Sequence, residues 1–527
     1  MNDGARLAIV LHAHLPYVRH PGRDDVLEEA WLVQALVDCY LPLLERIEGW
    51  VRDRVPFALA LSVSPTLIAM LDDPLLRRRS EERIAAALAV VERELVSPHR
   101  AAELSAPLAH HREHLVRVAA RNRALGGDVL GAFAALARGA PLELFTTAAT
   151  HAFLPNLAGL DAAMRAQLCT GIACHARRFG APPLGLWLPE CGFVEALDPL
   201  LAELGIRWSV VDAHALATAD PPALFGPYAP VCTPGGVAMF GRDPESSDAV
   251  WSAESGYPGH PLYREFHRDL GQSCDLRPHL PALDESGRGW PTGIKLHAVT
   301  DRGSDRKRAY DPDAAAHQAC ADARDFLAGR VARANALAPV LHRAPLFVAP
   351  FDAELFGHWW FEGPIFLDAL VREAAQRDDV TLVTPSAELA ARPRLQEAMP
   401  SASSWGAGGY RESWLDPRNA WVVREVREVA EQMTRLARDF AAERSELGRR
   451  ALAQAGREAL LAMASDWSFI LRAGTVSGYA EARIREHLAR FRSLAHELRA
   501  NAIDVQRLAA IEAEDGFVAD LDPGWFA

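Results

Sequence analysis

The chain has 527 residues, a length that at roughly 150 residues per domain predicts two to four domains. Hydrophobic residues make up 50% and charged residues 24% of it, which is close to the globular average and excludes disordered, collagen-like and coiled-coil proteins. The formal net charge of −13 repels polyanions. We therefore expect neither nucleic acid nor an anionic membrane as a partner, and a neutral or cationic ligand fits better.

Seven cysteines are scattered along the chain, and an odd, sparse set of this kind is not a disulfide framework. The pattern favours a reducing compartment, the cytoplasm. The first apolar run covers only residues 7–11, so no signal peptide is expected. No stretch approaches the roughly 20 uninterrupted apolar residues that a membrane span requires.

Short apolar runs alternate with helical stretches over about the first 400 residues, and each run is typical of a buried parallel strand. The runs cover residues 7–11, 57–63, 184–188, 208–211, 346–348 and 380–383. This alternation predicts an α/β fold, either a barrel or a doubly wound sheet. In such folds the functional residues follow the carboxyl ends of the strands.

Two segments interrupt the alternation, and a third follows it. Residues 72–135 have helical periodicity and predict an inserted helical region. Residues 218–262 are rich in Pro, Gly and Ser and predict a long active-site loop, with a surface excursion as the alternative. From about residue 418 the pattern is helical. We predict a catalytic unit over 1–400 and a C-terminal helical domain over 401–527.

The first strand ends in His12-Ala13-His14, and the period of two in a strand places both histidines on one face. Two histidines on one face can ligate a metal, but a metal site needs a third ligand, which the local spacing does not supply. Hydrogen bonding or packing is the other interpretation.

An acidic residue, Glu190, follows the predicted strand 184–188 in the segment Trp187-Leu-Pro-Glu-Cys-Gly-Phe193. A carboxylate there is either catalytic or caps a helix. Because Glu190 precedes Gly192 rather than leading directly into a helix, we favour catalysis.

The densest cluster of polar and aromatic residues is segment 349–363, Ala-Pro-Phe-Asp-Ala-Glu-Leu-Phe-Gly-His-Trp-Trp-Phe-Glu-Gly, again directly after a strand. Aromatic rings stack on sugars while carboxylates and imidazoles bind hydroxyls, so the segment suits a neutral polysaccharide. A tryptophan-rich barrel rim is the structural alternative. Glycoside cleavage needs two carboxylates, which lie roughly 5–5.5 Å apart in retaining enzymes, and Glu190 and Asp352 are the candidate pair.

With these motifs the chain resembles glycoside hydrolase family 57, and within it the 1,4-α-glucan branching enzymes and their relatives labelled α-amylases. The matching segments are HAHLPY from His12, THAFLPN around His151, WLPECGF around Glu190, the segment around Asp352, SSWG at 403–406 and SDW at 465–467. The resemblance implies an incomplete (β/α)7 barrel with an inserted region and a C-terminal helical domain. It also implies retaining chemistry on an α-1,4-glucan (amylose, glycogen or a maltooligosaccharide), with no metal and no other cofactor.

Carried over motif by motif, the resemblance makes Glu190 the nucleophile and Asp352 the general acid/base. The predicted substrate-binding residues are His12, His14, His151, Trp187, Arg264, His358, Trp359, Trp405, Trp414, Asp466 and Trp467. The acceptor then decides the activity: water gives an amylase, whereas the 6-hydroxyl of another glucan gives an α-1,6 branch.

The chain departs from the best-known branching members of the family at three places. Those members carry a tyrosine at the tip of a loop over the active site, whereas residues 231–240 here contain none and Tyr228 is the nearest. An early tryptophan is replaced by the sequence at 22–25, and 272–274 also lacks an aromatic residue. These departures favour hydrolysis, although we predict branching ahead of it.

Two other classes of function compete with this prediction. A metal-dependent hydrolase would use His12, His14 and His151 as ligands and would lose activity on chelation. A glucan-binding scaffold without catalysis would keep the tryptophans and lack the acids. The presence of both Glu190 and Asp352 argues against the scaffold.

Overall fold

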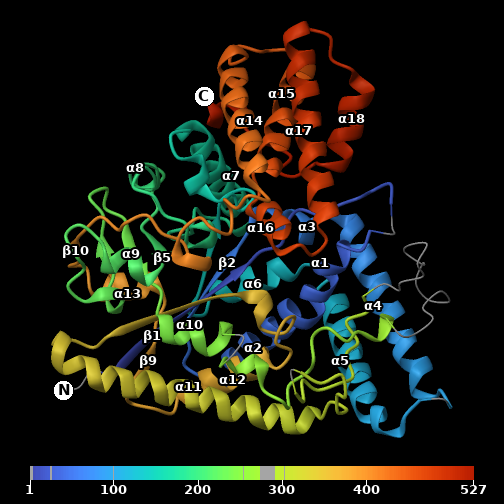
Figure 1. Ribbon diagram of the computed structural model, residues 1–527, viewed down its shortest axis with the longest axis vertical. Helices are drawn as coiled ribbons and strands as arrows, with labels where there is room; N and C mark the ends of the chain where they lie inside the picture. Colours follow the sequence, from blue (N-terminus) through green and yellow to red (C-terminus); the bar gives the residue numbers. More distant parts are fainter. Residues whose placement is uncertain (1–3, 24–25, 99, 253–254, 273–290, 302) are drawn as a thin grey trace.

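Within the described residues of the computed structural model, 4–23, 26–98, 100–252, 255–272, 291–301 and 303–527, seven parallel strands form a barrel (Figure 1). The strands, in chain order and with three that lie outside the barrel circuit, are β1 Ala5–Ala13, β2 Leu59–Val63, β3 Leu142–Thr147, β4 Leu186–Trp187, β5 Trp208–Val211, β6 Val231–Cys232, β7 Ala238–Gly241, β8 Leu346–Asp352, β9 Val380–Leu382 and β10 Gln396–Glu397.

The barrel is incomplete because two pairs of neighbouring strands are joined by a single bridge each. Full parallel ladders join β4, β3, β2, β1 and β8 in that order, and another joins β5 to β7. Only the single bridge Gly185–Trp208 joins β4 to β5, and only Arg242–Val348 joins β7 to β8. The expected incomplete (β/α)7 barrel is therefore confirmed.

The interior of the barrel is packed with side chains that alternate along the strands. One buried cluster takes residues from β1, β2, β3, β4, β5, β7 and β8: Ala8, Val10, Ala60, Phe145, Trp187, Trp208, Val210, Ala238, Phe240, Leu346 and Val348. Alternate residues of a barrel strand point inward, so the core fills the barrel and the polar chemistry is confined to its ends.

The helices surround this barrel. Those of residues 1–400 are α1 Glu29–Ala35, α2 Leu41–Arg52, α3 Pro65–Asp72, α4 Pro74–Leu95, α5 Ser105–Ala124, α6 Val129–Ala137, α7 Asp161–Phe179, α8 Leu197–Glu203, α9 Ala213–Ala217, α10 Pro244–Trp251, α11 Pro312–Leu341, α12 Gly363–Ala374 and α13 Pro385–Ala391. The helices α4, α5 and α6 follow one another between β2 and β3, where the sequence predicts a helical insertion.

Residues 218–262 differ from the predicted long loop. They contain the antiparallel pair β6–β7 and the helix α10, and β7 is a strand of the barrel itself. The side chain of Asp198 holds the turn between β6 and β7 by accepting a hydrogen bond from the Gly235 backbone N–H at 2.8 Å. The Gly- and Pro-rich composition therefore marks tight turns between short elements.

After residue 415 the chain is helical, with α14 Ala420–Asp439, α15 Glu446–Ala462, α16 Ser465–Ala473, α17 Ser477–Ala500 and α18 Val505–Glu514. These helices stand together at one end of the molecule, orange to red in Figure 1, and α16 reaches toward the barrel. Among the described helices, none is long and apolar enough to cross a membrane.

Candidate active site

Three histidines and a tryptophan stack at the carboxyl edge of the barrel. His12 and His14 come from the end of β1, and His151 follows β3. The ring of His151 lies 4.1 Å from that of His14 and 4.8 Å from that of His12, and His12 stacks on Trp187 at 5.0 Å, all between ring centroids. The structure thus brings together these four residues from three separate sequence motifs.

Each of these histidines is oriented by a serine. The Nδ1 atoms of His12 and His14 lie 3.1 and 3.0 Å from the hydroxyls of Ser62 and Ser64. Ser62 of β2 pairs in register with His12 of β1. Ser64 follows the end of β2 as the N-cap of α3, two residues beyond Ser62, and His14 lies two residues beyond His12. His151 Nδ1 lies 2.9 Å from the Ser465 hydroxyl of α16.

The outer nitrogens of the histidines are also occupied. His12 Nε2 lies 2.9 Å from His151 Nε2, and burial followed by the charge of His14 lowers the pKa of both rings. Burial opposes ionisation of His14 too, but Asp466, 3.1 Å from its Nε2, outweighs burial and raises its pKa. His14 therefore favours its protonated form more than His12 and His151 do.

Glu190 lies directly after β4 in a left-handed backbone conformation, with φ of 64°. Non-glycine residues adopt this conformation at an energetic cost, and such residues cluster at functional sites. Trp405 Nε1 donates to one carboxyl oxygen at 2.7 Å and the Ser465 hydroxyl donates to the other at 3.1 Å. Burial raises the pKa of Glu190 to about 7, although both hydrogen bonds oppose the rise.

Asp352 is the last residue of β8 and pairs in register with His12 of β1. Its carboxyl group accepts no hydrogen bond from any residue that the structure describes. Burial, followed by the negative charges of Glu354 and Glu190, raises the pKa of Asp352 well above its ordinary value. Asp352 therefore keeps its proton to a higher pH than an ordinary aspartate does, which suits a proton donor.

Glu354 lies two residues further on and is almost completely buried. Its carboxylate accepts hydrogen bonds from the Tyr40 hydroxyl and from the backbone N–H of His14, the latter at 3.1 Å. Tyr40 belongs to a π-helical turn, Leu36–Tyr40, a type of turn that is common at functional sites. Burial raises the pKa of Glu354 to about 7. Glu354 thus joins the ends of β1 and β8, and its ionised form places a negative charge near Asp352.

The predicted tryptophans fall into two groups. Trp405 packs edge-on against Trp187 at 5.0 Å between centroids, beside Glu190. Trp414 and Trp467 are both enclosed by protein: Trp414 stacks on Phe153, and Trp467 Nε1 donates to a main-chain carbonyl of α15.

Arg264, His358 and Trp359 form a separate group. Arg264 lies over the Phe361 ring at 3.8 Å and donates to Asp38, and Trp359, 54% exposed, stacks on Phe266. The hydrogen bonds, ion pairs and ring contacts of these side chains do not involve Glu190 or Asp352. Beside them a closed cavity of about 30 Å³ lies between α1, α4, α5 and residues 291–294.

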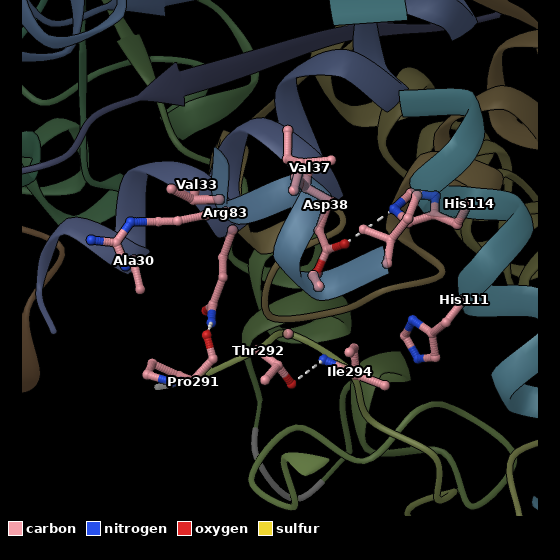
Figure 2. A pocket seen from close by; sticks show the side chains of 15 residues that line it. Ala30, Val33, Val37, Asp38, Arg83, His111, His114, Pro291, Thr292 and Ile294 are labelled. Carbon is pink, nitrogen blue, oxygen red and sulfur yellow. Dashed lines mark hydrogen bonds and ion pairs between the residues drawn. The ribbon is translucent and has the colours of Figure 1, made fainter. Parts of the chain in front are cut away.

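Figure 2 shows this cavity, with the side chain of Asp38 directed to His114 at 3.2 Å and His111 on the opposite wall. The Asp38 carboxylate is paired with cations, and its pKa is lowered although burial opposes this. The cavity holds neither catalytic candidate.

Among the residues that the structure describes, two sets of side chains have ligand atoms close enough to hold a metal ion. In the first, His14, His151 and Asp466, the atoms lie within 4.8 Å of one another. The second, Glu458, His487 and Asp515, lies among the C-terminal helices. In both sets the ligand atoms are engaged in hydrogen bonds to one another or to neighbours, which an ion would displace.

Several residues at the site are missing from the sequence prediction. Ser465 bonds both His151 and Glu190, Trp251 packs near Trp405 at 6.2 Å, and Arg242 lies over the Trp405 ring at 5.4 Å. Ser465 directly precedes the predicted Asp466, so its place in the motif was an available signal. For Arg242 and Trp251 the local sequence offers no comparable signal.

Residues 231–240, where other branching members carry the loop tyrosine, lie within the described part of the structure. Residues 231–240 form most of the β6–β7 hairpin, and Tyr228 packs edge-on against Phe347 of β8 at 5.6 Å while Arg333 donates to its hydroxyl. Asp24, Asp25 and residues 273–274, where the sequence lacks other expected aromatics, lie outside the described residues. Of the seven cysteines, the six that the structure describes are free thiols.

A parallel barrel with two buried carboxyl groups at the carboxyl end of its strands, surrounded by histidines and tryptophans, defines an enzyme of the glycoside-hydrolase type. Family models agree: residues 8–265 match "Glycosyl hydrolase family 57" and residues 425–526 match "1,4-alpha-glucan branching enzyme, C-terminal". The chain belongs to glycosyl hydrolase family 57.

Individual relatives cover nearly all of the chain. A probable 1,4-alpha-glucan branching enzyme of Mycobacterium tuberculosis is 31% identical over 98% of this chain and 96% of its own, and a branching enzyme of Thermococcus kodakarensis is 30% identical over 97% and 76%. Among solved structures, the alpha-amylase AmyC of Thermotoga maritima superposes with a TM-score of 0.92 at 36% identity, covering 99% of both chains. The GH57-type branching enzyme of Pyrococcus horikoshii superposes with a TM-score of 0.88 at 28% identity, covering 99% and 97%.

Proposed function

We propose that this protein is a retaining enzyme that cleaves an α-1,4-glucan and transfers the released segment to a 6-hydroxyl, creating an α-1,6 branch. The main support for the proposal is the difference between the surroundings of Glu190 and those of Asp352. Glu190 is fixed by two donated hydrogen bonds, whereas Asp352 accepts none from the described residues and has a raised pKa. A nucleophile needs fixed geometry and a general acid needs a proton, so the two residues have the properties that a double displacement requires.

In the first step the Glu190 carboxylate attacks the anomeric carbon while Asp352 gives its proton to the departing glycosidic oxygen. The C–O bond to the leaving chain breaks and a glycosyl ester on Glu190 forms. In the second step Asp352, now ionised, takes the proton of an acceptor hydroxyl, whose oxygen displaces Glu190. The Asp466 carboxylate can accept a hydrogen bond from a sugar hydroxyl while it stays paired with His14. A sugar hydroxyl can also take the place of the contact between His12 Nε2 and His151 Nε2 and bond to either ring.

The balance between branching and hydrolysis depends on which acceptor reaches the ester. Support for branching comes from two relatives named as branching enzymes and from the match of residues 425–526 to the branching-enzyme C-terminal model. Hydrolysis is the second candidate, because AmyC, titled an alpha-amylase, is 36% identical to this chain. A 4-α-glucanotransferase would run the same steps with a 4-hydroxyl as the acceptor.

The test is to incubate the purified protein with amylose and to quantify new α-1,6 linkages by proton NMR beside new reducing ends. Linkages well in excess of reducing ends are the expected result. Reducing ends alone would make the protein an amylase. The control is Glu190→Gln, which keeps the size of the side chain and removes the nucleophile; full activity in this variant would overturn the assignment.

A metal-dependent hydrolase is favoured by one observation, the close approach of His14, His151 and Asp466. It predicts that a chelator abolishes activity and that a divalent ion restores it, whereas the double displacement predicts no change. We also propose a cytoplasmic location, supported by the free thiols, and the division of the chain near residue 400. Segment 401–415 nevertheless supplies Trp405 to the site.

A further inference from the structure

A groove of about 320 Å³ lies on the surface beside the segment that carries Trp405. Residues 402–403 and 410–412 form one wall, and Pro155, Phe193 and Val194 contribute to the other. Tyr410 stands in it with half of its side-chain surface exposed, and Leu415 is similarly exposed. The groove therefore offers an open aromatic ring beside apolar surface.

One polar atom in the wall of the groove has no partner among the described residues. The Ser403 hydroxyl is buried, with the residue 4% exposed, and makes no hydrogen bond. Beneath Tyr410, the buried Nε2 of His214 is also unpartnered, and the His214 and Tyr410 rings lie 5.3 Å apart. Both atoms are covered by protein, so the polar side chains open to a ligand in the groove are those of Arg411 and Glu412.

The segments that line the groove also carry residues of the candidate active site. Phe193, three residues after Glu190, pairs with Ser403 by two main-chain hydrogen bonds. The backbone N–H of Trp405 donates to the main-chain carbonyl of Glu190 at 2.9 Å. The groove and the carboxyl group of Glu190 are thus built on the same pair of segments.

A second line of contacts runs from the active site to the groove. Arg242, over the ring of Trp405, donates to Asp212 at 3.1 Å, and Asp212 lies 3.0 Å from His214 Nδ1, which packs against Tyr410. These residues form a continuous strip of polar and aromatic side chains.

We propose that this groove is a glucan-binding site outside the catalytic centre, in which the Tyr410 ring stacks on a glucose residue and the exposed Arg411 and Glu412 side chains bond its hydroxyls. This proposal rests on the proposed function, since the ligand is a further part of the same α-glucan. The exposed ring supplies the apolar face that a pyranose needs. Arg411 and Glu412 beside it offer a donor and an acceptor whose charges cancel, which suits a neutral sugar better than an anion.

The test measures amylose binding by Glu190→Gln protein, in which turnover does not consume the probe. Affinity electrophoresis in gels containing soluble amylose gives a dissociation constant. Tyr410→Ala is expected to raise it about three- to tenfold, the range for a lost aromatic stacking contact. Tyr410→Phe, which keeps the ring, is expected to bind as the parent does. Val505→Ala, at a comparably exposed apolar residue on α18, is the matched control.

Unchanged binding in Tyr410→Ala would overturn the proposal, and so would an equal loss in Tyr410→Phe and Tyr410→Ala. Thermal unfolding of each variant shows that a loss does not come from misfolding. The amylose assay of the parent protein separates the two proposals. If the unchanged protein is active on amylose but Tyr410→Ala does not weaken binding, only the groove proposal is rejected. If the unchanged protein is inactive but amylose binding depends on Tyr410, only the catalytic proposal is rejected.

Discussion

Two buried clusters of acids and histidines in this molecule have different electrostatic environments. At the barrel edge lie Glu190 and Asp352 with the three histidines, and among the C-terminal helices lie Glu458, His487 and Asp515. Both clusters contain imidazole beside carboxylate. They differ in whether an arginine forms an ion pair with a carboxyl group of the cluster.

In the helical cluster the carboxylate of Asp515 is paired with Arg483 at 2.9 Å and with Arg490. Burial alone would raise its pKa, but His487 and the two arginines outweigh burial, so the pKa of Asp515 is lowered. Glu458, in the same cluster, has no arginine partner within ion-pair distance among the described residues, and burial raises its pKa. An ion-pair partner, and not burial, therefore decides whether a carboxyl group is charged here.

At the barrel edge no described arginine is paired with Glu190 or Asp352. Arg242 is the nearby cation, and its guanidinium is engaged by Asp212 and Ser247. The two carboxyl groups therefore keep raised pKa values. We read the helical cluster as a stabilising network and the barrel cluster as one held ready for proton transfer.

The largest expected effect is that of Asp352→Asn, which removes the proton donor and keeps the shape. We expect kcat/KM on amylose to fall by about 10²- to 10⁴-fold, the usual contribution of a general acid/base. An α-maltosyl fluoride is the sharper substrate, because fluoride leaves without a proton and its release should fall far less. An equal loss on both substrates would remove Asp352 from the acid role.

Asp515→Asn should break the helical cluster without touching catalysis. The buried Arg483 and the partly buried Arg490 lose their shared partner, so we expect the free energy of unfolding to fall by roughly 3 kcal/mol at pH 7. Because the pKa of Asp515 is lowered, its stabilisation is present at neutral pH and is lost as the pH falls through the acidic range, where the variant and its parent should converge. Denaturant titrations at several pH values measure this.

Asp352→Asn is the matched comparison for stability. Asp352 has no cation partner, so we expect its replacement to leave the free energy of unfolding unchanged or higher. A loss as large as that of Asp515→Asn would show that the two clusters do not differ as described.

Glu354→Gln should move the pH profile. Glutamine still accepts the hydrogen bonds from Tyr40 and from the His14 N–H, but the negative charge near Asp352 is gone. The pKa of Asp352 then falls, so the alkaline limb of kcat/KM should move to lower pH by about one unit. Glu354→Asp, which keeps the charge, is the control; an unmoved limb in Glu354→Gln would argue against electrostatic coupling.

The smallest effect is expected for Ser465→Ala, which deletes one hydrogen bond to Glu190 and one to His151. Neutral hydrogen bonds contribute about 0.5–1.5 kcal/mol, so kcat/KM should fall by about three- to tenfold. The acid limb should also move to higher pH, because the lost donor stabilised ionised Glu190. A shift in the opposite direction would contradict the hydrogen-bond assignment.

Most of the barrel was predictable because its buried strands are continuous apolar runs. The predicted runs correspond to β1, β2, β4, β5, β8 and β9. The strand β3 was missed because Glu143 interrupts its apolar pattern. The structure shows why this charge is tolerated: the Glu143 carboxylate accepts hydrogen bonds from Trp208 and Ser386 of other elements.

The strand β7 was missed for another reason. It has only four residues, Ala238–Gly241, and follows Gly235 and Gly236 in a segment whose composition is typical of a loop. Its strand state comes from pairing with β5, 27 or more residues away in the sequence, and not from local propensity.

The candidate site was predictable where its residues follow strands. Glu190, Asp352, His12 and His14 all stand at strand ends. Ser465 comes instead from α16, 275 residues from Glu190, and a local pattern cannot reveal a contact at that separation. The different surroundings of the acids also depend on tertiary packing, since the arginines that pair with Asp515 have no counterpart at the barrel edge.

The most direct test of the central claim is to trap the covalent intermediate. The protein would be incubated with a 5-fluoro-α-glucosyl fluoride, whose ring fluorine slows breakdown of the ester, and digested for peptide mass spectrometry. The account predicts one glycosylated peptide, with the sugar on Glu190, and no label in Glu190→Gln. A label on Asp352, or turnover by Glu190→Gln at the parent rate, would contradict the account.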